Sequence, residues 1–221
     1  MLPPQVQRGL EATLGVPVLE HYGATEAAQI SANLPPPGPA KAGTCGIPEM
    51  GILIIAGEDG RELPRGQEGE IWIRGPTLIS GYLDAPELNS AAFVGEWFRT
   101  GDLGRLDEEG YLVLLGRKNE IINRGGEKIS PREVDEALMD HPAVLQAVAF
   151  AVPHPMLGED VGAAVVLREG LSATEQELGA FLSERLAAFK TPRKILFLAE
   201  IPKGATGKLQ RIGLAQKLGL G

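Results

Sequence analysis

The sequence predicts a mixed α/β protein with a β-rich first half and a small α+β lobe after it. Three observations support this fold class. Short apolar runs separated by turn residues fill 46–115, helical and strand patterns alternate after residue 116, and 29 glycines and 17 prolines among 221 residues require many turns. Hydrophobic residues make up 43% of the chain, which is enough to bury one or two cores.

The first forty residues are expected to contain one helix and one strand. Val6, Leu10 and Leu14 recur every four residues, which predicts a short helix that ends at Gly15. Residues 16–19 are predicted to form a strand leading into a turn at Tyr22. The Pro-rich run 35–39 is expected to be a loop, because proline fits neither a helix interior nor a central strand.

Residues 30–115 are expected to form a small β-barrel or a distorted sheet. Strands are predicted at 51–55, 70–74 and 111–115, separated by turn signals at Asp59-Gly60 and Glu109-Gly110.

The C-terminal hundred residues are expected to form a compact α+β lobe. Ser130-Pro-Arg-Glu133 has the pattern of a capping box with proline at the first helical position, which predicts a helix over 131–139. Thr174-Glu-Gln-Glu177 predicts a second capped helix. Strands are predicted at 144–152, 161–167 and 195–198.

Charge and cysteine content exclude several classes of protein. The net charge is -8, which argues against a nucleic-acid or acidic-membrane surface. Cys45 is the single cysteine, so no intrachain disulfide can form, and no apolar run approaches the roughly 18 residues of a membrane span. We therefore expect a cytoplasmic protein. Its histidines, His21, His141 and His154, lack the spacing of a metal site.

Two positions in the first half combine residue types suited to binding a nucleotide. Thr25 and Glu26 follow a predicted strand, where a hydroxyl and a carboxylate could hold Mg²⁺ against phosphate oxygens; a plain capping turn is the alternative. Asp102 follows Thr100-Gly101, a predicted tight turn that would leave its carboxylate projecting to accept two ribose hydroxyls. Arg117 could add donors there. Each of these charged residues could also be an ordinary surface ion pair.

Two glycine-rich segments in the second half suggest further chemistry. In Arg124-Gly-Gly-Glu-Lys128, the two glycines would let another chain approach closely, although a plain turn before the capped helix is the alternative. Gly207-Lys208 is not a P-loop, because Gly204 lies only three residues before Gly207 and Leu209 follows the lysine.

Five segments in a fixed order resemble the carboxylate-activating adenylate-forming enzymes, which include acyl-CoA synthetases, peptide-synthetase adenylation domains and luciferases. They are Tyr22-Gly-Ala-Thr-Glu26, Gly69-Glu-Ile-Trp-Ile-Arg-Gly75, Phe98-Arg-Thr-Gly-Asp-Leu103, Gly116-Arg-Lys-Asn-Glu-Ile-Ile-Asn-Arg-Gly-Gly126 and Pro202-Lys-Gly-Ala-Thr-Gly-Lys208. The resemblance implies that 1–29 end a large N-terminal domain, 30–115 form its β-barrel-like subdomain, 116–120 form a hinge at Asn119, and 121–221 form the C-terminal lobe.

The resemblance also implies roles for single residues and a set of ligands: ATP or AMP, Mg²⁺, CoA and a small carboxylate. Lys208 would pair with the carboxylate and the α-phosphate during adenylation. The nucleotide would be bound by Tyr22 against the adenine, Gly23 beside it, Asp102 and Arg117 at the ribose, and Glu26, with Thr25, at Mg²⁺. CoA would pass Gly125 and Gly126, with Arg124 and Lys190 available to its phosphates.

The oxalyl-CoA synthetase branch of acyl-CoA synthetases is the most similar, with two departures. Gln29 stands where oxalate users have a histidine facing the substrate, and Asn119 stands where most relatives have Asp or Lys at the hinge. The family's Ser/Thr/Gly-rich loop, which wraps the ATP phosphates, does not occur in the sequence. We therefore expect the later part of such an enzyme, truncated and inactive alone. The alternatives are a fragment of an amino-acid or fatty-acid adenylation domain, or a non-catalytic nucleotide- or CoA-binding module.

Overall fold

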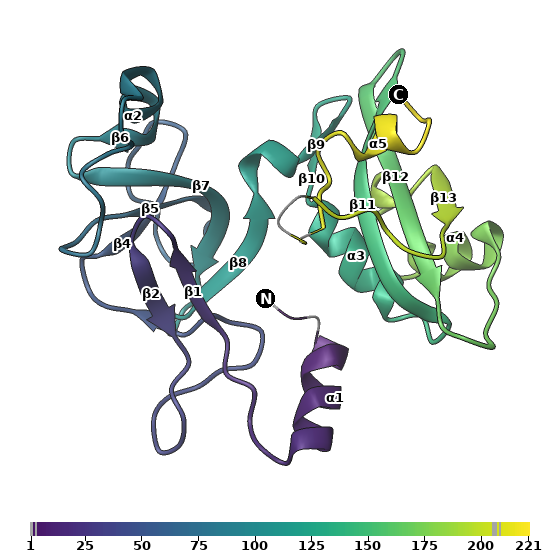
Figure 1. The fold of residues 1–221 in the computed structure, drawn as a ribbon, viewed down its shortest axis with the longest axis horizontal. Helices are drawn as coiled ribbons and strands as arrows, with labels where there is room; N and C mark the ends of the chain where they lie inside the picture. Colours follow the sequence, from purple (N-terminus) through teal and green to yellow (C-terminus); the bar gives the residue numbers. More distant parts are fainter. Residues whose placement is uncertain (1, 3, 205–206, 208) are drawn as a thin grey trace. The chain divides into compact units, whose positions relative to one another are not determined.

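The computed structural model describes the chain except residues 1, 3, 205, 206 and 208. It consists of two compact units, Met1–Lys118 and Asn119–Gly221 (Figure 1). Each unit has its own hydrophobic core. The mixed α/β fold class is confirmed. In the part of the chain that is described, no helix is long and apolar enough to cross a lipid bilayer.

The first unit begins with the predicted helix, but the strand expected at 16–19 does not form. Helix α1 (Pro4–Leu14) ends where the Gly15 N–H bonds to the Glu11 carbonyl at 2.9 Å, with Gly15 at φ +68°. The backbone groups of Val18 are bonded by side chains of the helix instead of a neighbouring strand. Its carbonyl accepts from Gln7 Nε2 (3.0 Å) and its N–H donates to Glu11 Oε1 (3.0 Å).

A small antiparallel sheet follows, made of β1 (His21–Ala24), β2 (Ala28–Ala32) and β3 (Ile47–Pro48) in that order. Tyr22 therefore lies in a strand, and the turn comes three residues later than expected, at residues 25–27. Gly23 is required by this hairpin, because a Cβ there would lie 2.5 Å from the Ala28 carbonyl oxygen.

The second sheet of this unit has the strand order β4-β5-β7-β6, and β8 also pairs with β7. Its strands are β4 (Leu53–Ala56), β5 (Gly69–Ile73), β6 (Phe93–Val94), β7 (Trp97–Leu106) and β8 (Leu112–Arg117). Helix α2 (Pro86–Ala92) precedes β6. The barrel-like closure expected for 30–115 is not confirmed, because the described strands pair as two sheets.

The turn expected at Thr100-Gly101 is instead a bulge inside β7. Arg99 pairs with Trp72 and Leu103 with Glu70, so three residues of β7 oppose Ile71 of β5 alone. Gly101 adopts φ +73°, and Thr100 Oγ1 donates to the Ile71 carbonyl at 2.7 Å. A bulge redirects side chains without ending the strand, which is how Asp102 comes to project.

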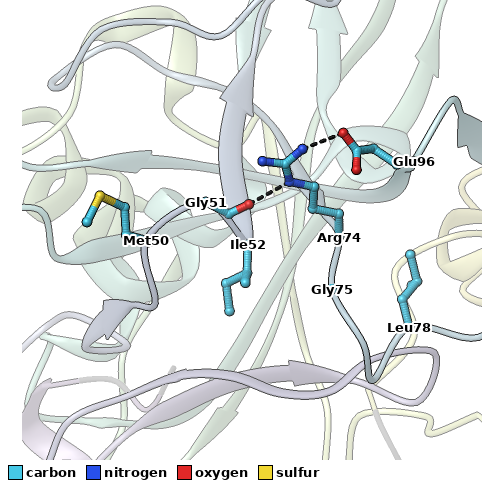
Figure 2. A pocket seen from close by; sticks show the side chains of 7 residues that line it. All are labelled: Met50, Gly51, Ile52, Arg74, Gly75, Leu78 and Glu96. Carbon is cyan, nitrogen blue, oxygen red and sulfur yellow. Dashed lines mark hydrogen bonds and ion pairs between the residues drawn. The ribbon is translucent and has the colours of Figure 1, made fainter.

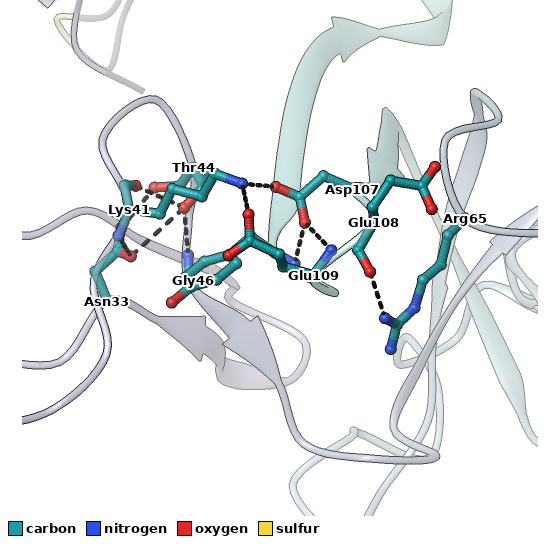
Figure 3. A network of polar contacts seen from close by, with 9 residues as sticks. Asn33, Lys41, Thr44, Gly46, Arg65, Asp107, Glu108 and Glu109 are labelled. Atoms are coloured by element: carbon teal, nitrogen blue, oxygen red, sulfur yellow. Dashed lines mark hydrogen bonds and ion pairs between the residues drawn. The ribbon is translucent and has the colours of Figure 1, made fainter.

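The Pro-rich loop before β3 is tied to the turn between β7 and β8 by a polar network around Lys41 (Figure 3). Lys41 Nζ lies 2.7 Å from Asp107 Oδ2 and 2.6 Å from Glu109 Oε1. These hydrogen bonds, the one to Asp107 first, raise the pKa of Lys41 above its ordinary value. The Asp107 carboxylate also accepts the Tyr111 N–H (2.9 Å), so one side chain closes the turn and anchors the loop.

The second unit is a five-stranded sheet with cores on both faces of its central strands. The order is β10-β9-β12-β11, and β13 pairs parallel to β12. The short 3₁₀ helix η1 (Lys118–Glu120) spans the boundary between the units. The elements after it are β9 (Ile122–Arg124), β10 (Glu127–Ile129), α3 (Pro131–Met139), β11 (Val144–His154), β12 (Gly158–Leu167), α4 (Glu175–Ser183), η2 (Ala188–Lys190), β13 (Lys194–Phe197) and α5 (Leu214–Lys217).

Alternating residues of β11 and β12 serve the two cores of this unit. Ala147 and Ala149 join the core under α3 and α4, whereas Val148 and Phe150 join a second core with the α5 segment. Helix α3 has the predicted bounds, although the Ser130 side chain does not make the cap hydrogen bond. The capping box predicted at Thr174 and Glu177 is formed in full.

Candidate active-site regions

The first candidate site joins two of the sequence segments through Asp102. The Tyr22 hydroxyl on β1 donates to Asp102 Oδ2 at 2.8 Å, and Arg117 Nε on β8 donates to Asp102 Oδ1 at 3.1 Å. Asp102 and Arg117 are direct partners across the β7–β8 ladder. Each carboxylate oxygen keeps further acceptor capacity, so Asp102 can still accept ribose hydroxyls.

Tyr22 is only 5% exposed, so a ligand could reach no more than an edge of its ring. Burial, and next the charge of Asp102, raise the pKa of Tyr22 above its ordinary value. The hydroxyl therefore stays protonated and acts as a fixed donor to Asp102. Arg117 is 63% exposed along its side chain, which leaves its guanidinium accessible to a ligand.

Glu26 is held at the turn between β1 and β2 by a residue that the sequence did not point to. The Tyr82 hydroxyl donates to Glu26 Oε1 at 2.8 Å, and the Ile79 N–H donates to the Glu26 carbonyl at 2.8 Å. Burial and the hydrogen bond to Glu26 raise the pKa of Tyr82 to about 12, so it too remains a donor. The Tyr82 ring packs edge-on against Phe93 and Phe98.

This turn fits a magnesium ion only if phosphates supply most of its ligands. Within the described residues, no group of three or more His, Cys, Asp or Glu side chains could hold a metal ion. Mg²⁺ commonly takes one or two protein carboxylates, with substrate phosphates and water completing the octahedron. Glu26, half-buried and oriented by Tyr82, together with the exposed Thr25, matches that pattern.

Gly125 and Gly126 form the two-residue turn between β9 and β10. Their φ values are +59° and +99°, and Arg124 pairs with Glu127 across the turn. Positive φ at both positions is typical of a type I′ hairpin, which glycine adopts without strain. A Cβ on Gly126 would meet no atom of the described residues within 4 Å, so the space beside the turn is open.

Arg124 and Lys190 are each paired with a different carboxylate. Arg124 Nε lies 2.7 Å from Asp160 Oδ1, and Asp160 is 2% exposed. Burial alone would raise the pKa of Asp160, but the hydrogen bond from Arg124 lowers it. Lys190 Nζ lies 2.7 Å from both carboxylate oxygens of Glu133.

A further cation that the sequence did not point to is Arg193. It is exposed, and its Nη1 lies 3.2 Å from His154 Nε2. Asp160 Oδ2 is buried and has no hydrogen-bond partner among the described residues.

Lys208 lies outside the described residues. Among its described neighbours, the Gly207 N–H bonds to the Gly204 carbonyl at 2.9 Å, and Lys203 bridges antiparallel to Leu209. Asn119, the predicted hinge, is the first residue of the second unit and is exposed.

A surface pocket elsewhere on the first unit contains none of the predicted site residues (Figure 2). It is lined by Met50, Gly51, Ile52, Arg74, Gly75, Leu78 and Glu96. Its one cation is fully engaged, because Arg74 bonds to the Gly51 carbonyl (2.7 Å), pairs with Glu96 and stacks on the Trp97 ring at 4.5 Å. We assign no chemistry to this pocket.

Comparison with known proteins agrees with the sequence segments. Residues 1–83 match the profile of the AMP-binding enzyme family, and residues 133–208 match that of the AMP-binding enzyme C-terminal domain. An oxalate–CoA ligase of Arabidopsis thaliana is 46% identical over 217 residues, which are 97% of this chain and 42% of that protein. A sulfoacetate–CoA ligase of Cupriavidus necator is 43% identical, with 96% and 42% covered.

Solved structures extend the similarity to three dimensions. ATP-bound MatB from Rhodopseudomonas palustris matches with a TM-score of 0.90 and 34% identity, over 97% of this chain and 43% of that one. An o-succinylbenzoate CoA synthetase from Bacillus subtilis, in complex with its acyl-adenylate intermediate, matches with a TM-score of 0.82 and 35% identity, over 96% and 43%. The chain spans about two fifths of the length of these relatives. Both family profiles, the order of the five segments and these neighbours lead to one conclusion: the chain belongs to the AMP-binding enzyme family.

Proposed function

We propose that the chain is the later part of an AMP-forming acyl-CoA synthetase. In the first half-reaction, a carboxylate oxygen attacks the α-phosphorus of ATP and pyrophosphate leaves, which gives an acyl-adenylate. In the second half-reaction, the CoA thiolate attacks the acyl carbon and AMP leaves. The rest of the enzyme would be the segment that the relatives have in addition to this chain.

The observation that carries this function is the Tyr22–Asp102–Arg117 arrangement. It joins positions 80 and 15 residues apart in the sequence into one hydrogen-bonded set. A buried tyrosine that cannot ionise holds a carboxylate in place, and an exposed guanidinium flanks it. Asp102 would accept the ribose hydroxyls, and Arg117 would donate to the ribose or a phosphate.

The charges that develop during adenylation would be met by two further residues. Glu26, oriented by Tyr82 and flanked by Thr25, would help to bind Mg²⁺, which when bound neutralises charge on the phosphates. Lys208 would pair with the substrate carboxylate and the α-phosphate. A unit charge about 4 Å from a developing charge contributes roughly 4 kcal/mol at an effective dielectric constant near 20.

Thioester formation would use the Gly125-Gly126 turn of the second unit. The open space beside Gly126 suits a thin pantetheine arm. Arg124, Lys190 and the exposed Arg193 could bind the CoA phosphates, although Arg124 and Lys190 would first exchange carboxylate partners for phosphate.

The acid substrate is proposed to be a small carboxylate other than oxalate. The named relatives act on oxalate and sulfoacetate, but Gln29 offers an amide where oxalate users have a histidine. Gln29 is exposed on β2, directly opposite Gly23. We also place the protein in the cytoplasm, since a single cysteine cannot form an intrachain disulfide and suits a reducing compartment.

Titration of the ¹⁵N-labelled chain with AMP and with CoA, each with a matched variant, tests both sites separately. AMP should shift amide signals near Asp102 and Arg117 and should fail to do so in Asp102→Ala. CoA should shift signals at 124–126 and fail in Arg124→Gln. A chain fused to the N-terminal part of the Arabidopsis oxalate–CoA ligase should then make acyl-CoA. Unchanged spectra with both ligands, and an inactive but folded fusion, would reject the function.

A further inference from the structure

The turn between β1 and β2 is followed by a residue whose backbone is strained. The Ala27 N–H bonds to the Ala24 carbonyl at 3.1 Å, and Ala24 pairs with Ala28, so residues 25–27 connect the two strands. Ala28 adopts φ +56°. In a three-residue hairpin the residue that closes the turn typically lies in the left-handed region, which glycine occupies freely and an L-residue occupies at a cost. Contacts from outside the hairpin are therefore needed to keep an alanine there.

Residues 77–82, the holding segment, supply three hydrogen bonds to this turn. Thr77 Oγ1 donates to the Ala27 carbonyl at 2.9 Å. The Ile79 N–H donates to the Glu26 carbonyl, and the Tyr82 hydroxyl donates to Glu26 Oε1, both at 2.8 Å. The three bonds engage the backbone of two consecutive turn residues and the Glu26 side chain. They fix the carboxylate relative to the backbone from which it projects.

Tyr82 is itself fixed by Asn89 of helix α2. Asn89 Oδ1 accepts the Tyr82 N–H at 2.7 Å, and Asn89 Nδ2 donates to the Tyr82 carbonyl at 2.8 Å, so one amide group pairs both polar backbone groups of Tyr82. Gly81 makes room for it, because a Cβ there would lie 3.2 Å from both polar atoms of the Asn89 side chain. Edge-on packing against Phe93 and Phe98 orients the Tyr82 ring. Backbone and ring are thus both held where the hydroxyl reaches the turn.

We infer that Thr77, Tyr82 and Asn89 are positioning residues that keep the strained turn, and with it the Glu26 carboxylate, in one conformation. Thr77 and Tyr82 act on the turn directly, whereas Asn89 acts through Tyr82. Strained backbone persists where the surrounding contacts over-determine it, and the holding segment supplies those contacts. The inference concerns a turn inside the first unit, so the holding of the turn does not depend on the reaction.

The consequence for the reaction rests on the proposed function, in which Glu26 helps to bind Mg²⁺. A carboxylate that already has its binding orientation loses less conformational freedom when an ion binds. Thr25, exposed in the same turn, would be presented by the same contacts. Weakening the holding segment should therefore weaken magnesium binding without removing a ligand.

Relaxation dispersion of the ¹⁵N-labelled chain measures how often Ala28 leaves positive φ, a state defined here as the released turn. Thr77→Val and Tyr82→Phe each remove one hydroxyl hydrogen bond and keep most of the side chain. Each bond contributes about 5-fold to the equilibrium, so the double variant should raise the population of the released turn about 30-fold, as seen at the amides of 25–28. Adding Ala28→Gly should lower that population again by about 5-fold or more, because glycine keeps positive φ without strain.

Two matched variants serve as controls. Thr77→Ser keeps the hydroxyl and should keep the native turn. Thr13→Val removes a hydroxyl hydrogen bond of 2.8 Å to the Gly9 carbonyl, which lies within helix α1, and should leave the turn unchanged. A native population of the released turn in the double variant, or no reversal by Ala28→Gly, would overturn the inference.

Asn89→Ala tests whether Asn89 acts through Tyr82. On its own it should release the turn about as much as Tyr82→Phe does. Combined with Tyr82→Phe it should add little, because both changes weaken the same contact to Glu26. Additive effects of the two changes would exclude Asn89 as a residue that positions the turn through Tyr82.

The dependence of adenylation on magnesium separates the inference from the proposed function. In the fusion to the N-terminal part of the oxalate–CoA ligase, Tyr82→Phe should raise the half-saturating Mg²⁺ concentration about 5-fold, whereas Thr13→Val should not. A released turn with an unchanged magnesium dependence would reject the metal role of Glu26 and still support the positioning of the turn. An unchanged turn by relaxation dispersion would reject the positioning itself, whatever the fusion catalyses.

Discussion

The two candidate sites differ in what their cations already contact. In the first unit, Tyr22 and Arg117 both donate hydrogen bonds to Asp102, and the Arg117 side chain remains 63% exposed. In the second unit, Arg124 and Lys190 are 30% and 23% exposed and are paired with Asp160 and Glu133. A nucleotide would therefore meet an acceptor already in place, whereas CoA phosphates would have to compete with carboxylates. Under the proposed function, the nucleotide site would be preorganised, whereas the CoA site would have to rearrange before thioester formation.

The largest expected effect is on the rate of adenylation when Lys208 is replaced. Lys208→Ala, in a full-length fusion, should lower the rate of adenylation about 10²-fold or more, the equivalent of roughly 3 kcal/mol of transition-state stabilisation. Thioester formation from supplied acyl-adenylate should be largely retained. Single-turnover assays of each half-reaction measure this, and equal losses in both would contradict the role of Lys208.

The next effect tests whether Asp102 is the acceptor in the first site. Asp102→Asn keeps the size of the side chain but removes its charge. AMP affinity should fall about 10- to 100-fold, as expected for hydrogen bonds to a charged group worth roughly 1.5–3 kcal/mol. Calorimetric titration provides the measurement, with Asp160→Asn as the control in the other unit. A similar fall in AMP affinity in Asp160→Asn would show that the effect is not specific to Asp102.

A smaller effect is expected from crowding the open side of the glycine turn. Gly126→Ala and Gly126→Leu incur the same backbone penalty of about 1–2 kcal/mol for an L-residue at positive φ. Only the leucine side chain is long enough to block a pantetheine path. Thioester formation should therefore be slower in Gly126→Leu than in Gly126→Ala, with adenylation equal in the two. Equal thioester rates would make the glycine purely structural.

The smallest effect concerns Tyr82 and has a pH signature. Tyr82→Phe removes one hydrogen bond to Glu26, so it should destabilise the protein by about 1 kcal/mol at neutral pH. The folded pKa of about 12 lies above the ordinary value of 10.0, so the stabilisation is complete below pH 10 and is lost as pH rises through 12. Urea denaturation between pH 8 and about 11.5 should show the gap between wild type and variant closing. A constant gap would mean that Tyr82 does not ionise in this range.

Local sequence signals predicted local structure well. The bounds of α3 and the capping box of α4 follow from a few adjacent residues, and both form as expected. The prediction of a turn at Gly101 was wrong. A glycine with positive φ can occur in a turn or in a β-bulge, and only the pairing of β7 with β5 distinguishes the bulge from the turn. The strand expected at 16–19 failed because helix α1 supplies the hydrogen bonds of Val18.

The candidate site residues were found through sequence segments, but their partners were not. Tyr82 is 56 residues from Glu26, and Asp160 is 36 residues from Arg124. No spacing rule links such pairs, because the tertiary fold of each unit brings them together. Whether a cation is available to a ligand depends on the carboxylate with which it is paired. The availability of Arg124 and Lys190 therefore could not be predicted from the sequence.

The division at Lys118 and Asn119 also governs how the chain comes apart. Two units with separate cores need not unfold together, so calorimetry should resolve two heat-absorption peaks, and one unfolding free energy would not describe the whole chain.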